Sequence, residues 1–138
     1  MDLYRLPPIS NGNPEEQALI RRWWHEQHAA RGLMVWEYYL NGCYVDAVWF
    51  HDHSATGTEE QGLKAPIRFP IIGKPIVLCE AKVRLTPELI GQALVYGSFA
   101  RRLGADVAGI VIFAKSGSHA LVTAAEDLGL QVVLSEAF

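Results

Sequence analysis

Apolar residues occur in separate runs along the chain, and the spacing within each run predicts its secondary structure. Two runs rich in aromatic and β-branched residues are joined by Asn41-Gly42, a dipeptide that strongly favours a two-residue hairpin turn. Three later runs are short and apolar, which is typical of buried strands. The predicted strands are 33–40, 43–50, 75–83, 107–114 and 130–134.

Three helices are predicted from residues that favour helix ends. Asn13 and Thr86 each precede a proline, and a polar N-cap followed by proline at the first position is typical of a helix start. Glycine follows each helical segment, as expected near a helix C-terminus. The predicted helices are 14–30, 86–103 and 118–128, while 1–13 is predicted as an irregular lead-in and 51–74 as a loop excursion.

The element order α-β-β-β-α-β-α-β predicts an α/β fold with a mixed β-sheet flanked by helices. Within it, residues 75–114 form a strand–helix–strand unit, which is expected to be a right-handed crossover between parallel strands. The length of 138 residues fits one domain, 1–138, and no internal repeat is evident.

Composition narrows the classes of protein that the chain could belong to. Half of the residues are hydrophobic, which is enough for a packed core, and no apolar run has the roughly 20 residues needed to span a bilayer. No signal-peptide pattern is visible at the N-terminus, so a cytoplasmic location without membrane contact is expected. Cys43 and Cys79 lie in apolar runs, where a free cysteine behaves as a small hydrophobic residue.

Charge is distributed unevenly around a net charge of −3. Residues 62–115 hold eight basic and three acidic side chains, a local charge of +5, whereas the remainder carries −8. A basic half of this kind could face the phosphates of a nucleic acid. Ordinary scatter of surface charge is the alternative interpretation.

Two acids and a lysine are the strongest candidates for chemistry. Asp46 and Glu80 each lie within an apolar strand, where a buried carboxylate is costly unless it is paired or bound to a metal ion. Lys82 lies two residues after Glu80, so the two side chains are expected to leave the same face of the strand. Carboxylates holding a hard divalent cation beside a lysine suit phosphodiester hydrolysis. The alternative is an exposed Glu–Lys pair and a solvated aspartate.

The predicted hairpin adds Glu37 to this group. With a two-residue turn at 41–42, counting back along the strands places Glu37 directly opposite Asp46. Like charges in such a position repel unless a cation or a proton lies between them. Glu37 is therefore a neighbour of a metal site, a carboxyl group with a raised pKa, or a sign of a different register.

The order of these residues resembles a known nuclease signature. Asp46 followed by Glu80-Ala81-Lys82 is similar to the split acid…Glu-x-Lys motif of the PD-(D/E)XK nuclease superfamily, which has the restriction-endonuclease-like fold. Gly42 four residues before Asp46, and Gln92 four residues before Tyr96, resemble the Gly-x-x-x-Asp and Gln-x-x-x-Tyr motifs of its RecB-like branch. The resemblance covers roughly residues 14–114.

This resemblance implies a Mg²⁺ or Mn²⁺ site and a nuclease acting on nucleic acid, with DNA favoured over RNA and the choice between them left open. Asp46, Glu80 and the Ala81 carbonyl would be the metal ligands, and Lys82 would be catalytic. A glutamate of the first helix completes the site in many members of the family. Glu16 is preferred here to Glu15, since Glu16 shares a helix face with apolar residues. The supporting or substrate-contacting candidates are Gln92, Tyr96, Glu37 and Arg84.

Several alternatives stay open at the level of sequence. A catalytically silent domain of the same fold could bind a nucleic acid or a protein partner, and a plain α/β interaction domain would need no metal. A homodimer could form through aromatic residues expected to be exposed, namely Trp36, Tyr38 and Trp49. The pairs His25/His28 and His51/His53 could bind a transition metal, but solvated surface histidines are the simpler interpretation.

Overall fold

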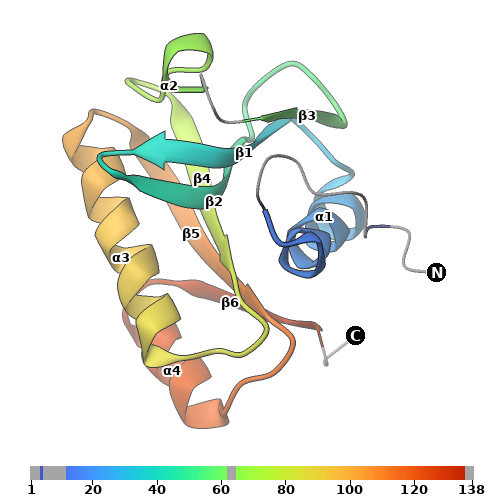
Figure 1. The fold of residues 1–138 in the computed structure, drawn as a ribbon, viewed down its shortest axis with the longest axis vertical. Coiled ribbons are helices and arrows are strands. Elements are labelled where there is room, and N and C mark those ends of the chain that lie inside the picture. Colours follow the sequence, from blue (N-terminus) through green and yellow to red (C-terminus); the bar gives the residue numbers. More distant parts are fainter. Residues whose placement is uncertain (1–3, 5–11, 62–64, 136–138) are drawn as a thin grey trace.

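A single mixed sheet organises the part of the chain that the structure describes (Figure 1). The computed structural model describes residues 4, 12–61 and 65–135. The elements in chain order are α1 (Pro14–His28), β1 (Leu33–Leu40), β2 (Cys43–Phe50), β3 (Thr58–Gln61), α2 (Ala65–Arg68), β4 (Pro75–Ala81), α3 (Pro87–Arg102), β5 (Asp106–Ala114), α4 (His119–Asp127) and β6 (Gln131–Leu134).

The six strands lie in the order β3-β1-β2-β4-β5-β6. β1 and β2 form the predicted antiparallel hairpin, in which Leu40 faces Cys43 across Asn41-Gly42. β2 pairs with β4 in the antiparallel sense, whereas β4, β5 and β6 are mutually parallel. The predicted mixed α/β fold and the order of its eight elements are thereby confirmed.

Helices cover the two faces of the sheet unequally (Figure 1). α1 packs on one face and buries its tryptophans against β1, β2, β4 and β5, and this group is called the α1-side core. α3 and α4 cover the opposite face and define the α3-side core. None of the described helices combines the length and apolar composition that crossing a bilayer requires. The alternation of β4 follows from this layering, because Ile76 and Leu78 belong to one core and Val77, Cys79 and Ala81 to the other.

The helix starts behave as predicted from their capping residues. The Asn13 side chain accepts the backbone N–H groups of Glu15 and Glu16, and the Thr86 hydroxyl accepts that of Leu89. The ends differ slightly. α1 stops at His28 rather than Ala30, since Ala29 and Ala30 both take positive φ values near 50°. β4 stops at Ala81 rather than at residue 83.

The region 51–74 contains more regular structure than the predicted loop. β3 (Thr58–Gln61) has the polar sequence Thr-Glu-Glu-Gln, and it becomes a strand because it pairs in parallel with the first half of β1. α2 adds a single short turn. Most of the predicted lead-in, 1–3 and 5–11, and residues 62–64 of the excursion lie outside the described residues.

Trp36, Tyr38 and Trp49 are buried, so the prediction that these aromatic residues are exposed is wrong. Trp36 and Trp49 lie in the α1-side core, and Tyr38 lies in the α3-side core. The Tyr38 hydroxyl donates to the carbonyl of Phe69 at 2.8 Å. Their burial follows from the position of β1 and β2 in the middle of the sheet, with a helix layer on each face. Both cysteines are free thiols, as expected.

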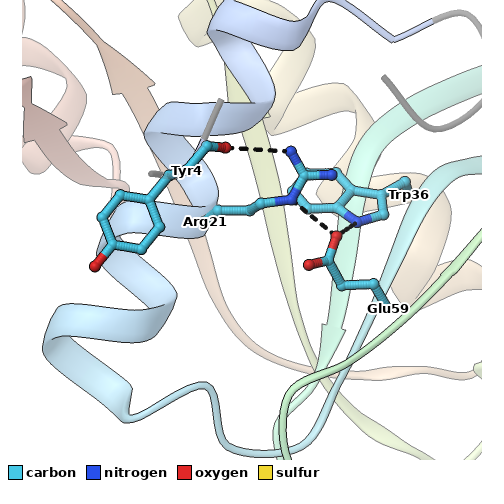
Figure 2. A network of polar contacts seen from close by, with 4 residues as sticks. All are labelled: Tyr4, Arg21, Trp36 and Glu59. Atoms are coloured by element: carbon cyan, nitrogen blue, oxygen red, sulfur yellow. Dashed lines mark hydrogen bonds and ion pairs between the residues drawn. The ribbon is translucent and has the colours of Figure 1, made fainter. Parts of the chain in front are cut away.

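A buried ion pair ties β3 to α1 (Figure 2). The Arg21 side chain is 1% exposed, and its Nε donates to Glu59 Oε1 at 2.9 Å. The same oxygen accepts the Trp36 indole N–H at 2.6 Å, and the guanidinium lies over the Trp36 ring. Arg21 Nη1 also reaches the Tyr4 carbonyl at 3.5 Å. Besides its backbone pairing with β1, the polar strand β3 is therefore held by a neutralised charge rather than by apolar burial.

Replacing Arg21 tests this ion pair. Arg21→Met should lower the free energy of unfolding by roughly 3 kcal/mol, because it leaves the Glu59 carboxylate without its cation in a partly buried position. Arg22→Met is the matched control: Arg22 forms an exposed pair with Glu26, and its loss should change stability by about 0.5 kcal/mol or less. Urea denaturation measures both. Equal effects of the two substitutions would show that the buried pair does not hold β3.

Candidate functional site

At one point along the β1–β2 hairpin, the alternation of side chains between the two faces of the sheet is interrupted in both strands. Trp36 and Tyr38 are two residues apart, a spacing that keeps side chains on one face of a regular strand, yet they lie in opposite cores. Val45 and Ala47 on β2 are divided in the same way. Pairing passes from Trp36–Ala47 to Tyr38–Val45 and omits the positions between them. The residues at this break are the acids Glu37 and Asp46.

Glu37 thus lies opposite Asp46 along the hairpin, but the two are not a paired position of the ladder. Glu37 has a φ of 52°, in the left-handed region that most L-residues avoid. Two like charges meet at the point where the strand is distorted. Local strain of this kind is concentrated at functional sites.

At Asp46 and Glu80, hydrogen bonds to side-chain carboxylates replace the backbone hydrogen bonds between β2 and β4. The regular pairing ends at Ala47–Cys79, one position before these acids. From there, the Asp46 N–H donates to Glu80 Oε1 at 2.9 Å, and the Ala81 N–H donates to Asp46 Oδ2 at 2.8 Å. Each carboxylate therefore accepts a backbone amide of the other strand. Two acids distant in sequence are fixed beside each other by this exchange.

Burial makes the ionised forms of these two acids unfavourable. Glu80 is 3% exposed, and burial followed by the charge of Asp46 raises the pKa of its carboxyl group. Burial likewise raises the pKa of Asp46, against the opposing effect of the Ala81 N–H. Among the described residues, neither acid forms an ion pair with a basic side chain. The pair is thus short of positive charge.

Glu16 and Glu37 line the same small cavity as Asp46. A cavity of about 10 Å³ lies between the start of α1 and the sheet, and Glu16, Glu37, Asp46 and Ala81 are among its lining residues. Burial raises the pKa of Glu16 and of Glu37, and the charge of Asp46 raises both further. A volume of this size has room for about one water molecule or one small cation. Glu16, Glu37, Asp46 and Glu80 are called the acid site below.

Lys82 lies just beyond the end of β4. Its backbone N–H donates to the Phe113 carbonyl at 3.0 Å, which extends the pairing with β5, and its side chain is exposed. The Lys82 charge lowers the pKa of every acid in the acid site, although larger effects raise those values. An exposed ammonium group beside buried carboxylates can contact a ligand that arrives from solvent.

The supporting candidates separate into two groups. Tyr96 on α3 is half-buried, and burial together with Glu80 raises the pKa of its hydroxyl to about 12. Tyr96 therefore approaches the acid site from the face opposite α1. Gln92 and Arg84 are exposed, and within the described chain no interaction joins either of them to an acid of the site.

Glu15 pairs with Lys115, the residue after β5, and it is not among the residues that line the cavity beside Glu16. Gln17, by contrast, is a buried polar residue that lines the same cavity as Glu16. The sequence interpretation missed Gln17. Its spacing of three and seven residues from Ile20 and Trp24 would have placed it on the buried face of α1.

The two histidine pairs are only partly buried: His25 and His53 are exposed, whereas His28 and His51 are half-buried. His25 contacts Tyr4, and His28 contacts Trp23 and Trp49. His53 Nδ1 accepts the Ala55 N–H. Across the described ranges, no three His, Cys, Asp or Glu side chains converge closely enough to form a metal-binding cluster. The acid site has a donor set of carboxylate oxygens that suits a hard divalent cation. Asp46 lies beside Glu80, and Glu16, Glu37 and Asp46 line the cavity.

The raised pKa values predict that, without a metal ion, the protein becomes less stable as pH rises. Above pH 4.5 an unfolded glutamate has lost its proton, whereas folded Glu80 retains it, so the unfolded state binds fewer protons. The free energy of unfolding should then fall by up to about 1.4 kcal/mol per pH unit for each such group as pH rises. Glu80→Gln should reduce this slope between pH 5 and pH 8 in EDTA.

Glu88→Gln is the control for that substitution, because Glu88 is exposed in the first turn of α3. Urea denaturation at several pH values gives the slope for each protein. A slope that is identical in the wild type, Glu80→Gln and Glu88→Gln would contradict the assigned burial of Glu80.

Comparison with known proteins supports the fold. No protein-family model matches the chain, and no curated protein matches it in sequence. Among solved structures, the fold is similar to that of a repair endonuclease from Pyrococcus abyssi, with a TM-score of 0.54 and 17% identity. The similarity covers 91% of this chain and 49% of that endonuclease, so the chain spans about half of its length. The mixed sheet flanked by helices is therefore an endonuclease-like fold.

Proposed function

We propose that this protein is a divalent-metal-dependent nuclease that hydrolyses phosphodiester bonds, most readily in DNA. One observation carries the proposal: Asp46 and Glu80 are held side by side at the break between β2 and β4, without a basic partner among the described residues. Such a pair is unfavourable unless a cation or a proton neutralises it. A divalent cation does so with the oxygen ligands that it prefers.

The residues that would hold the ion are Asp46, Glu80 and the Ala81 carbonyl, with Glu16 or Glu37 as the further acid. Mg²⁺ or Mn²⁺, when bound, stabilises charge on the phosphoryl oxygens and lowers the pKa of a bound water. The chain itself holds Asp46 and Glu80 in place through backbone N–H groups, which cannot move away as a long side chain can. This fixes the position of the negative charge.

Lys82 would act at the solvent side of the site. Its exposed ammonium group can donate to a phosphate oxygen or orient the attacking water. Tyr96 would support Glu80 from the opposite face of the sheet. These assignments agree with membership of the PD-(D/E)XK superfamily and its RecB-like branch, which we propose from the motifs together with the endonuclease-like fold.

The choice of DNA as substrate follows from the fold and from the distribution of charge. The repair endonuclease of similar fold gives a reason to test DNA first. The basic stretch 62–115, which includes Lys82 and Arg84, gives the chain cations close in sequence to the acid site.

A catalytically silent nuclease-fold domain is the second candidate. The two central carboxylates already accept backbone amides, so they also have a purely structural use. Such a domain would bind a nucleic acid or a protein partner without cutting.

Lys82→Ala should abolish cleavage while leaving the protein folded. The assay is a panel of circular, linear, single-stranded and branched DNA, incubated with Mg²⁺, Mn²⁺ or EDTA. Loss of general acid–base or phosphate contacts typically costs 10²-fold to 10⁴-fold in rate, so we expect a fall of roughly that size. Lys74→Ala, an exposed lysine at the opposite end of β4, is the control and should cut normally. Cleavage of equal rate in Lys82→Ala would refute the assignment of Lys82.

Metal binding is expected to stabilise the protein. At pH 8, Mn²⁺ at about 100 times its dissociation constant should add roughly 2.7 kcal/mol to the free energy of unfolding. Glu80→Gln should lose this gain, because it removes one carboxylate, whereas Glu88→Gln should retain it. Thermal unfolding with increasing Mn²⁺ measures the shift. A metal-dependent shift without cleavage of any DNA would favour the silent domain.

A further inference from the structure

An exposed pair of tyrosines lies at the end of the β1–β2 hairpin. Tyr39 is 45% exposed and Tyr44 is 51% exposed, although both belong to central strands of the sheet. They are directly paired across the hairpin, and their ring centroids are 5.5 Å apart with planes at 70°. Two adjacent aromatic rings at a solvent boundary form a defined apolar surface, called here the tyrosine platform.

The tyrosine platform lies on the same face of the sheet as the cavity of the acid site. Beyond the break in the hairpin, Tyr38, Leu40 and Val45 belong to the α3-side core. Strand alternation then directs Tyr39 and Tyr44 to the opposite face, which is the face of α1. The cavity lined by Glu37 and Asp46 opens between that face and α1.

The spacing between the tyrosine platform and the acid site is small. Tyr39 is two residues from Glu37, and Tyr44 is two residues from Asp46, so each separation along the strand is about 6–7 Å. The change of face at Glu37 and Asp46 is what brings the rings to this side. In a regular hairpin with the same register, Tyr39 and Tyr44 would point into the α3-side core instead.

Two exposed rings beside the place where the proposed function puts a phosphate fit one kind of ligand. Nucleobases stack on aromatic side chains without regard to sequence, because every base has a π-face. Bases inside a duplex are stacked on each other and do not offer that face, whereas unpaired bases do. Tyrosine combines a stacking surface with a hydroxyl that remains in water at such a boundary.

We propose that Tyr39 and Tyr44 bind an unpaired nucleobase next to the phosphate at the acid site, so that the ligand is single-stranded nucleic acid or an unpaired segment. This inference rests on the proposed function for the position of the phosphate. It specifies the strandedness of the substrate, which the acids alone do not. A second copy of this chain seated on the tyrosines is the competing occupant, and the test below includes it.

The experiment compares binding of single-stranded and duplex DNA by fluorescence anisotropy. The ligands are a labelled 12-nucleotide strand and the blunt duplex of the same sequence, measured in EDTA and in Ca²⁺. Removing both rings in Tyr39→Ser/Tyr44→Ser should weaken single-strand binding at least tenfold, since stacking contributes about 1–3 kcal/mol per base. Duplex binding should change less than about twofold. Tyr39→Phe/Tyr44→Phe keeps the rings and should retain single-strand binding.

Stability is measured in parallel, because cross-strand aromatic pairs also stabilise hairpins. If the serine variant fails to fold, Tyr39→Leu/Tyr44→Leu preserves apolar contact without a flat ring and should show the same loss of binding. The proposal is overturned if the leucine or serine variant binds the single strand as well as the wild type, or if the wild type prefers duplex or binds neither. It is also overturned if sedimentation shows a wild-type dimer that the serine variant dissolves.

The two proposals fail separately. Lys82-dependent cleavage that persists with unchanged KM in the serine variant would remove the stacking role and leave the nuclease assignment intact. Tyrosine-dependent single-strand binding by a protein that never cleaves would remove the nuclease assignment and support the tyrosine platform as part of a binding domain.

Discussion

The rest of the site depends on two hydrogen bonds between β2 and β4, in each of which a carboxylate accepts a backbone N–H group. At Asp46 and Glu80 the two strands stop bonding to each other directly, and each carboxylate accepts an N–H group from the opposite strand. Because every buried N–H needs an acceptor, these carboxylates hold the sheet together at the point where its strands separate. The same contact fixes two negative charges side by side, so the fold and the candidate chemistry use the same atoms.

The protein deals with the acids that lie within its sheet in two different ways. Glu59 lies beside Arg21, and the charge is neutralised within the chain, which attaches β3 to the sheet (Figure 2). Asp46 and Glu80 have no such cation among the described residues, and burial raises the pKa of both. The first arrangement is complete in the absence of a ligand. The second is unfavourable when both acids are ionised, and a proton or an added cation makes it favourable.

Local signals in the sequence were reliable guides where the physics is local. The hairpin at Asn41-Gly42 and the helix starts at Asn13 and Thr86 form as predicted, because turn and cap geometry depend on a few neighbouring residues. β3 could not be predicted in this way, since its polar residues form a strand only through pairing with β1 and through the Arg21 contact. The supposed exposure of Trp36 was wrong for a related reason: burial depends on which helix covers the strand.

The sequence by itself determined the α/β element order, the hairpin register that sets Glu37 opposite Asp46, and the presence of acids in apolar strands. These follow from side-chain period, turn chemistry and the cost of burying charge. Only the tertiary structure decided that Glu80 reaches the amide of Asp46, that Gln17 lines the cavity beside Glu16, and that the hairpin turns Tyr39 and Tyr44 toward the α1 face. These features depend on how separate elements pack and on the distortion at Glu37 and Asp46. Packing and distortion of this kind leave no periodic pattern in the sequence.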